Sequence, residues 1–150
     1  MDSADVRTTL FPVVALAVGL AIPVQASAAE DSGKVCIMRV SDPATLVAIE
    51  VSENGTMVAK VKVHQYFCVE HRPGTYEYTA KLWTNKEPGP PVPAVLKAAE
   101  TLYYRAEYVV RTELGTPYFL LGAIDENTYR GLLPAVKPVS AANLFFVPSP

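Results

Sequence analysis

The sequence predicts an all-β protein: a single antiparallel β-sandwich of about seven to eight strands, followed by a short C-terminal helix. From residue 34 onward, short alternating segments are separated by turn residues at intervals of about eight to twelve positions, which is typical of sandwiches and barrels. The period of two gives each strand one buried face, as antiparallel sheets require. The composition, 50% hydrophobic, is enough for a core.

The first half of the domain contains four predicted strands. Residues 34–40 form the first, and Asp42-Pro43 ends it. Residues 46–53 and 57–63 form the next two. Between them stands Asn54-Gly55, the strongest short hairpin signal, because both central positions of a type I′ turn need positive φ. Residues 65–70 continue as the fourth strand.

The second half contains the remaining strands and the helix. The turn Pro73-Gly74 leads into a strand over 75–84, and the proline-rich segment 86–93 is expected to be a surface loop. Residues 94–99 have helical propensity, but their length between loops favours a strand. The last elements in order are strands over 102–110 and 118–124 and a helix over 126–133, which Asp125 can cap.

Residues 1–28 have the layout of a secretory signal peptide. Residues 10–24 are uncharged and mostly apolar, and Ala26-Ser27-Ala28 forms a cleavage site of the A-x-A type. The apolar run is shorter than the roughly 20 residues that span a bilayer, although an uncleaved N-terminal anchor is the alternative. The expected organisation is a signal peptide over 1–28, a sandwich domain over 33–133 and a proline-rich extension over 134–150, with a periplasmic or secreted location.

Charge and cysteine content limit the partners further. The formal net charge is −2 and no basic stripe occurs, so a nucleic-acid partner is not expected. No second apolar run is long enough to cross a membrane. Cys36 and Cys68 are the only two cysteines. In an oxidising compartment they are candidates for a disulfide, but the sequence leaves their pairing open.

Several segments carry a resemblance to a known family. They are Met38-Arg39-Val40, residues 47–51 leading into Asn54-Gly55, residues 66–69 running into 72–76, and Ala99-Glu100-Thr101 before residues 102–104. In these segments the region from residue 33 to about 133 resembles a family of bacterial cell-envelope proteins called domain of unknown function 2846. That family looks related to the PEGA domain, so the resemblance implies a small transthyretin-like sandwich. Many members look like lipoproteins, whereas this chain lacks a cysteine at the cleavage point.

His64, Cys68 and His71 are residue types that bind zinc or copper. On an extended strand, His64 and Cys68 lie about 13 Å apart and His71 points to the opposite face, so a shared metal site is not expected. The histidines are expected to face solvent. No catalytic motif is present, and Asp125-Glu126 is explained by helix capping. We therefore predict no catalytic, cofactor-binding or metal-binding residues.

Aromatic and apolar residues outside the core are the candidates for partner contacts. Tyrosines 76, 78, 104 and 108 lie on predicted buried faces. Trp83 and Tyr103 fall on outward faces, where aromatic residues favour interaction surfaces. The tail residues Leu144, Phe145 and Phe146 either add an edge strand to their own sheet or donate a strand to a partner.

These patterns favour a non-enzymatic envelope protein, a binding or scaffold module for another envelope protein or a cell-wall component. Two alternatives stay open. The first is a carrier of a small apolar ligand, based on the aromatic residues of the inner faces. The second is an enzyme with an unrecognised site, which a cleft that gathers His64, His71 and a carboxylate would indicate.

Overall fold

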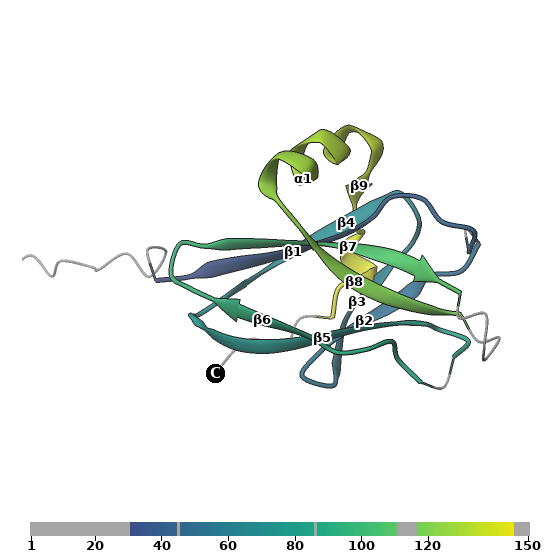
Figure 1. The fold of residues 1–150 in the computed structure, drawn as a ribbon, viewed down its shortest axis with the longest axis horizontal. Helices are drawn as coiled ribbons and strands as arrows, with labels where there is room; N and C mark the ends of the chain where they lie inside the picture. The colour runs from purple at the N-terminus through teal and green to yellow at the C-terminus, as the bar shows by residue number, and fades with distance from the viewer. Residues whose placement is uncertain (1–30, 45, 86, 111–116, 146–150) are drawn as a thin grey trace, which may run out of the picture.

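Two β-sheets pack face to face in the computed structural model, which describes residues 31–44, 46–85, 87–110 and 117–145 (Figure 1). The first sheet, which we call sheet A, has the order β8-β7-β1-β4-β9, and sheet B has the order β3-β2-β5-β6. The strands are β1 (Gly33–Arg39), β2 (Ile49–Glu53), β3 (Thr56–Val61), β4 (Gln65–His71), β5 (Gly74–Leu82), β6 (Val92–Leu96), β7 (Thr101–Val109), β8 (Tyr118–Ile124) and β9 (Lys137–Pro138). The predicted all-β sandwich is confirmed.

Two strand pairs are parallel, which the prediction of an antiparallel sandwich did not include. β1 runs parallel to β7 at the centre of sheet A, and the two-residue β9 runs parallel to β4. The physical reason is the crossover from β6 in sheet B. The turn after β6 contains Ala99 at φ 56°, and it starts β7 beside the beginning of β1. The N–H of Lys34 then donates to the carbonyl of Glu100 at 2.8 Å.

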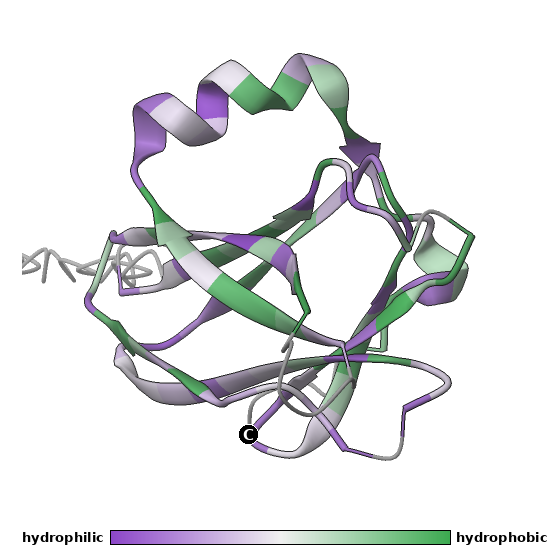
Figure 2. Cartoon of the chain, turned by 45° about the vertical axis from the view of Figure 1, so that its right-hand side comes forward, coloured by the Kyte–Doolittle hydropathy of each residue, from purple (hydrophilic) through white to green (hydrophobic). Residues whose placement is uncertain are grey.

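The core lies between the inner faces of the sheets. Burial alternates along β4 and along most of β5, and Figure 2 shows hydrophobic and hydrophilic residues changing along the strands. The fully buried side chains include Val35, Ile37, Ile49, Val51, Val61, Tyr78 and Phe119.

Local signals placed the hairpin and the helix correctly. Asn54 and Gly55 have φ values of 47° and 81°, as the type I′ turn requires. Helix α1 (Glu126–Leu132) begins after Asp125, whose carboxylate accepts from the backbone N–H of Thr128 at 2.9 Å. Hydrogen bonds from Thr128 hold the pKa of Asp125 below its usual value.

The proline-rich segment differs from the expected loop. β6 begins at Val92 and includes Pro93, so its strand starts earlier than the predicted 94–99. Pro93 is tolerated because β6 is an edge strand of sheet B, where one row of N–H groups needs no partner. The carbonyl of Pro93 still accepts from the hydroxyl of Tyr104 at 3.4 Å.

Helix α1 packs across the outer face of sheet A (Figure 1). Its buried residue Tyr129 contacts a second apolar cluster that includes Cys36, Met38, Tyr66 and Tyr103. Two short 3-10 turns follow, η1 (Leu133–Ala135) and η2 (Ala141–Asn143). No helix in the described part of the chain is long and apolar enough to cross a membrane.

The described part of the C-terminal extension packs on the sandwich. β9 pairs with the start of β4, and Val139 is buried in the main core. Leu144 forms an isolated antiparallel bridge with Ala59 of β3, and the N–H of Phe145 donates to the carbonyl of Val58 at 2.8 Å. Residues 137–145 therefore join the β4 side of sheet A to the β3 edge of sheet B.

Candidate functional site

Cys36 and Cys68 form a disulfide between β1 and β4. The two residues lie directly opposite each other in the register, with their Cα atoms 4.1 Å apart. The bond faces helix α1, and the sulfur of Cys68 lies 3.8 Å from the hydroxyl of Tyr129. The disulfide therefore supports the outer face of sheet A beneath the helix.

His64 and His71 stand at opposite ends of β4 and do not share a site. His64 is exposed at φ 59° in the turn before the strand. His71 is the last residue of β4 and is buried, so the expectation that it faces solvent is wrong. It points inward because it continues the buried row of Gln65, Phe67 and Val69. No group of three or more potential metal ligands is found among the described residues.

His71 belongs to a buried polar cluster that joins the two sheets. Its Nε2 lies 2.7 Å from a carboxylate oxygen of Glu53 and 3.1 Å from the hydroxyl of Tyr78. The Tyr78 hydroxyl donates to the same carboxylate oxygen at 2.6 Å. The ring of Tyr76 stacks on the imidazole, with ring centroids 4.4 Å apart. Glu53 and Tyr78 come from sheet B, whereas His71 comes from sheet A.

The environment of this cluster keeps the phenol of Tyr78 neutral. Burial raises the pKa of Tyr78 far above its usual value, and the hydrogen bond to Glu53 raises it further. Nδ1 of His71 is buried without a hydrogen-bond partner among the described residues. The cluster can hold the sheets together through charge-assisted hydrogen bonds.

Tyr103 lies on the outer face of sheet A, as predicted, but helix α1 covers much of it. Its ring packs against Tyr129 of the helix, with centroids 4.5 Å apart. This packing within the chain is sufficient to explain why an aromatic residue stands at position 103. Of the tail candidates, Leu144 and Phe145 contact β3, and Phe146 lies outside the described residues.

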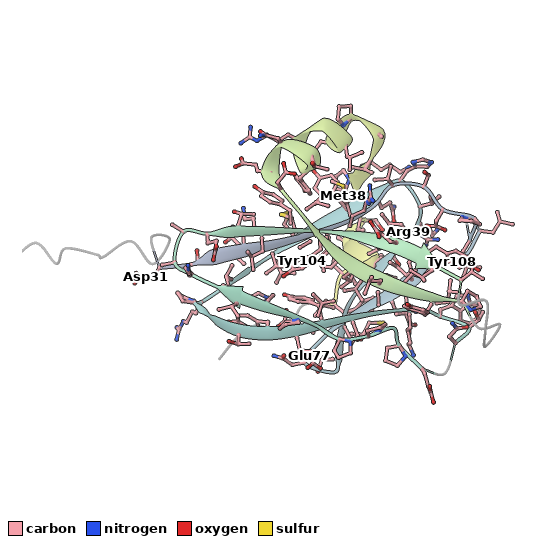
Figure 3. All side chains as sticks on the ribbon, viewed as in Figure 1. Asp31, Met38, Arg39, Glu77, Tyr104 and Tyr108 are labelled. Atoms are coloured by element: carbon pink, nitrogen blue, oxygen red, sulfur yellow. A yellow bond between two sulfur atoms is a disulfide. The ribbon has the colours of Figure 1, made fainter. Side chains whose placement is uncertain are left out.

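Arg39 organises one end of the sandwich, a role that the sequence pattern did not predict. The side chain is fully buried, with an exposed fraction of 0%, and lies over the ring of Phe119. Its guanidinium binds both carboxylate oxygens of Asp42, at 2.6 and 2.8 Å. It also donates to the carbonyls of Ala44 at 2.7 Å and Val47 at 2.6 Å. Figure 3 shows Arg39 near this end of the molecule.

These contacts fix the described part of the loop between β1 and β2, which we call the anchored loop (residues 40–44 and 46–48). The loop meets the ends of other strands at one end of the sandwich (Figure 1). The N–H of Trp83, just after β5, donates to the carbonyl of Ala48 at 3.4 Å. The side chain of Asn85 donates to the carbonyl of Pro117, just before β8, at 3.1 Å.

Three exposed apolar side chains stand in segments at this end, which we call the loop end: Leu46 between β1 and β2, Trp83 just after β5 and Val110 just after β7. The exposed fractions are 98% for Leu46, 60% for Trp83 and 58% for Val110. Trp83 is thus exposed as the sequence analysis predicted. An open pocket of about 350 Å³ lies at the same end, lined by residues 40–43, residues 105–108 and Leu132.

Comparison with known proteins adds no family assignment. No protein-family model, curated protein or solved structure matches this chain. The resemblance to the domain of unknown function 2846 family therefore rests on the sequence segments alone and stays a prediction. The geometry of the loop end and of the buried clusters is what bears on function.

Proposed function

We propose that this protein is an exported, non-catalytic β-sandwich module that binds another protein of the cell envelope through its loop end. The observation that carries the proposal is the exposure of Trp83 together with Leu46 and Val110 at one end of the fold. Large exposed apolar side chains carried at one end of a fold are candidates for a protein contact. Tryptophan is prominent among the residues that dominate binding energy.

The anchored loop supports this proposal because its shape is fixed before any partner arrives. Arg39 binds Asp42 and the carbonyls of Ala44 and Val47, so these described residues before and after Leu46 are held. A surface that is already ordered loses little conformational entropy on binding, which favours affinity. Loops carried at one end of a rigid sandwich are a common place for recognition.

Export is the second part of the proposal. It is supported by the signal-peptide pattern of residues 1–28, which lie outside the described residues. The Cys36–Cys68 disulfide agrees with an oxidising compartment. The family resemblance points to the same location.

The polar cluster of Glu53, His71 and Tyr78 has a structural explanation, so we do not assign catalysis to it. The three side chains bond to one another across the two sheets. Nε2 of His71, the hydroxyl of Tyr78 and the carboxylate of Glu53 thus serve as partners for one another.

The test is capture from an envelope extract with immobilised protein and three variants. Trp83→Ala and Leu46→Ser alter the loop end, and Val95→Ala is the matched control because Val95 is an equally exposed apolar residue on β6. We expect one protein to be retained by the wild type and by Val95→Ala and lost with both loop-end variants. Equal retention by all four forms, or retention of cell-wall material alone, contradicts the proposal.

A further inference from the structure

β7 has an unpaired stretch at the place where β1 ends. The parallel register runs from Lys34 opposite Thr101 to Met38 opposite Arg105. β7 continues to Val109, and along this whole stretch β8 pairs with its other side. Residues 106–109 thus have a strand neighbour on one side only within the described chain.

The backbone groups of this stretch point into the space beyond β1. The carbonyl of Glu100 accepts from the N–H of Lys34, so the even-numbered residues of β7 direct their backbone groups toward β1. The next groups in line after β1 ends are the carbonyl of Ala106 and the N–H and carbonyl of Tyr108. No turn or loop of the described residues hydrogen-bonds to them.

The open pocket of about 350 Å³ lies against this edge, and we call it the β7 slot. The start of the anchored loop forms one wall, β7 forms the other, and Leu132 at the end of α1 completes the lining. The walls are fixed, because Asp42 is bound by Arg39 and β7 is held by β8. A volume in the range of ligand sites, roughly 300–1,000 Å³, is therefore already formed.

The charged groups of the slot are compensated within the protein. Arg105 bonds to Glu107 through Nε at 3.1 Å, and Asp42 bonds to Arg39. The slot consequently favours a neutral ligand that offers alternating hydrogen-bond donors and acceptors along a line. A peptide main chain has this chemistry, and strand addition to an exposed edge is a recurrent mode of recognition.

We propose that the β7 slot binds an extended peptide segment of the partner protein, which continues the line of β1 along the edge of β7. The inference rests on the proposed function and names the chemistry of the contact. Main-chain hydrogen bonds to Ala106 and Tyr108 hold the segment, and the neighbouring apolar side chains of the loop end contact the rest of the partner.

The probe is a phage-displayed library of random short peptides, selected on the purified protein. Selected peptides are then titrated into nitrogen-15-labelled protein. We expect the amide of Tyr108 to shift and to become protected from hydrogen exchange. If the selected peptides leave this amide unchanged, or if it is already protected without peptide at high protein concentration because a second copy fills the slot, the proposal is overturned.

Two pairs of variants test the location. Ser41→Trp fills the slot from an exposed position, and we expect it to weaken peptide binding by at least tenfold, whereas Ala98→Trp at the opposite end leaves binding unchanged.

Tyr108→Pro removes the N–H that faces the slot but keeps the bonds to β8, which odd-numbered residues make. Compared with Tyr108→Ala, which loses the same ring, we expect Tyr108→Pro to bind about tenfold more weakly, the worth of one hydrogen bond.

The results separate this proposal from the broader one. If Ser41→Trp does not reduce peptide binding, the proposal of the slot is overturned. If Trp83→Ala nevertheless loses the envelope partner, the loop end is still supported as a binding surface. If both Ser41→Trp and Trp83→Ala retain the partner in full, the slot and the proposed function fail together.

Discussion

Arg39 and Asp42 form a bidentate ion pair inside the protein, with N–O distances of 2.6 and 2.8 Å. The side chains are only 0% and 4% exposed. Such a pair offsets its own desolvation only when its remaining hydrogen bonds are made. Here backbone carbonyls from the anchored loop and from Val61 accept the other N–H groups. The pair therefore couples the shape of the loop end to the core.

Removing one charge of this pair is expected to be costly. Asp42→Asn leaves a buried guanidinium without its counter-ion, and breaking a buried pair in this way costs about 3–5 kcal/mol in the free energy of unfolding. Urea denaturation gives the value. Glu126→Gln is the matched control, because it breaks the exposed pair with Arg130 on α1 and is expected to leave stability unchanged. Equal effects of the two variants would show that the buried pair has no special role.

The buried tyrosines predict a loss of stability at alkaline pH. Burial raises the pKa of Tyr129 to about 12, and burial with the bond to Glu53 raises the pKa of Tyr78. An unfolded tyrosine ionises near pH 10. Below that pH both states keep the phenol proton and the stabilisation is complete. Above it only the unfolded chain loses the proton, so the free energy of unfolding falls as pH rises toward 12.

Urea midpoints measured from about pH 8 to about pH 11.5 check this sign. Tyr129→Phe is the control, because it removes one of the raised groups and is expected to make the alkaline decline shallower. A midpoint that stays level above pH 10, or a decline of the same slope in the variant, contradicts the assignment.

Local chemistry was readable from the sequence where a residue and its partner are close along the chain. Asn54-Gly55 adopts the positive φ values of its hairpin, and Asp125 caps α1 through Thr128. The alternation of β5 likewise identified Tyr78 as buried. In each case the deciding contact lies within a strand or within one helical turn, so the pattern alone determines it.

The features that were missed depend on contacts across the fold. Arg39 is buried because carbonyls from Val47 and Val61 converge on it, and no local pattern shows that convergence. The one available signal was an arginine at the end of an apolar strand with an aspartate three residues later. The burial of His71 could have been predicted in part, since its side chain lies on the same face of β4 as Phe67 and Val69. Tyr103 is covered by Tyr129, so its partial burial depends on where α1 packs against sheet A.

The disulfide is expected to contribute substantially to stability. Cys36 and Cys68 are 32 residues apart in sequence, and closing a loop of that length stabilises a protein by about 3–4 kcal/mol in the chain-entropy model. The double variant Cys36→Ala with Cys68→Ala should lose about this amount in urea denaturation. A reducing agent should lower the stability of the wild type to the same level and leave the variant unchanged. A wild type that is indifferent to reductant contradicts the prediction.

Two glycines of contrasting environment provide a further test of the packing. Gly89 lies between the sheets' edges, where its N–H donates to the carbonyl of Ala80 at 2.9 Å and a methyl group would overlap the carbonyl oxygen of Phe119. Gly89→Ala therefore forces the loop after β5 away from β8, and overpacking of this kind costs about 1–3 kcal/mol. Gly131 lies in α1, with open space where its Cβ would be. Gly131→Ala should stabilise the protein by about 0.5–1 kcal/mol, because alanine is the better helix former. Urea denaturation of both variants measures the two signs. A Gly89→Ala variant as stable as the wild type would mean that the loop does not press against β8.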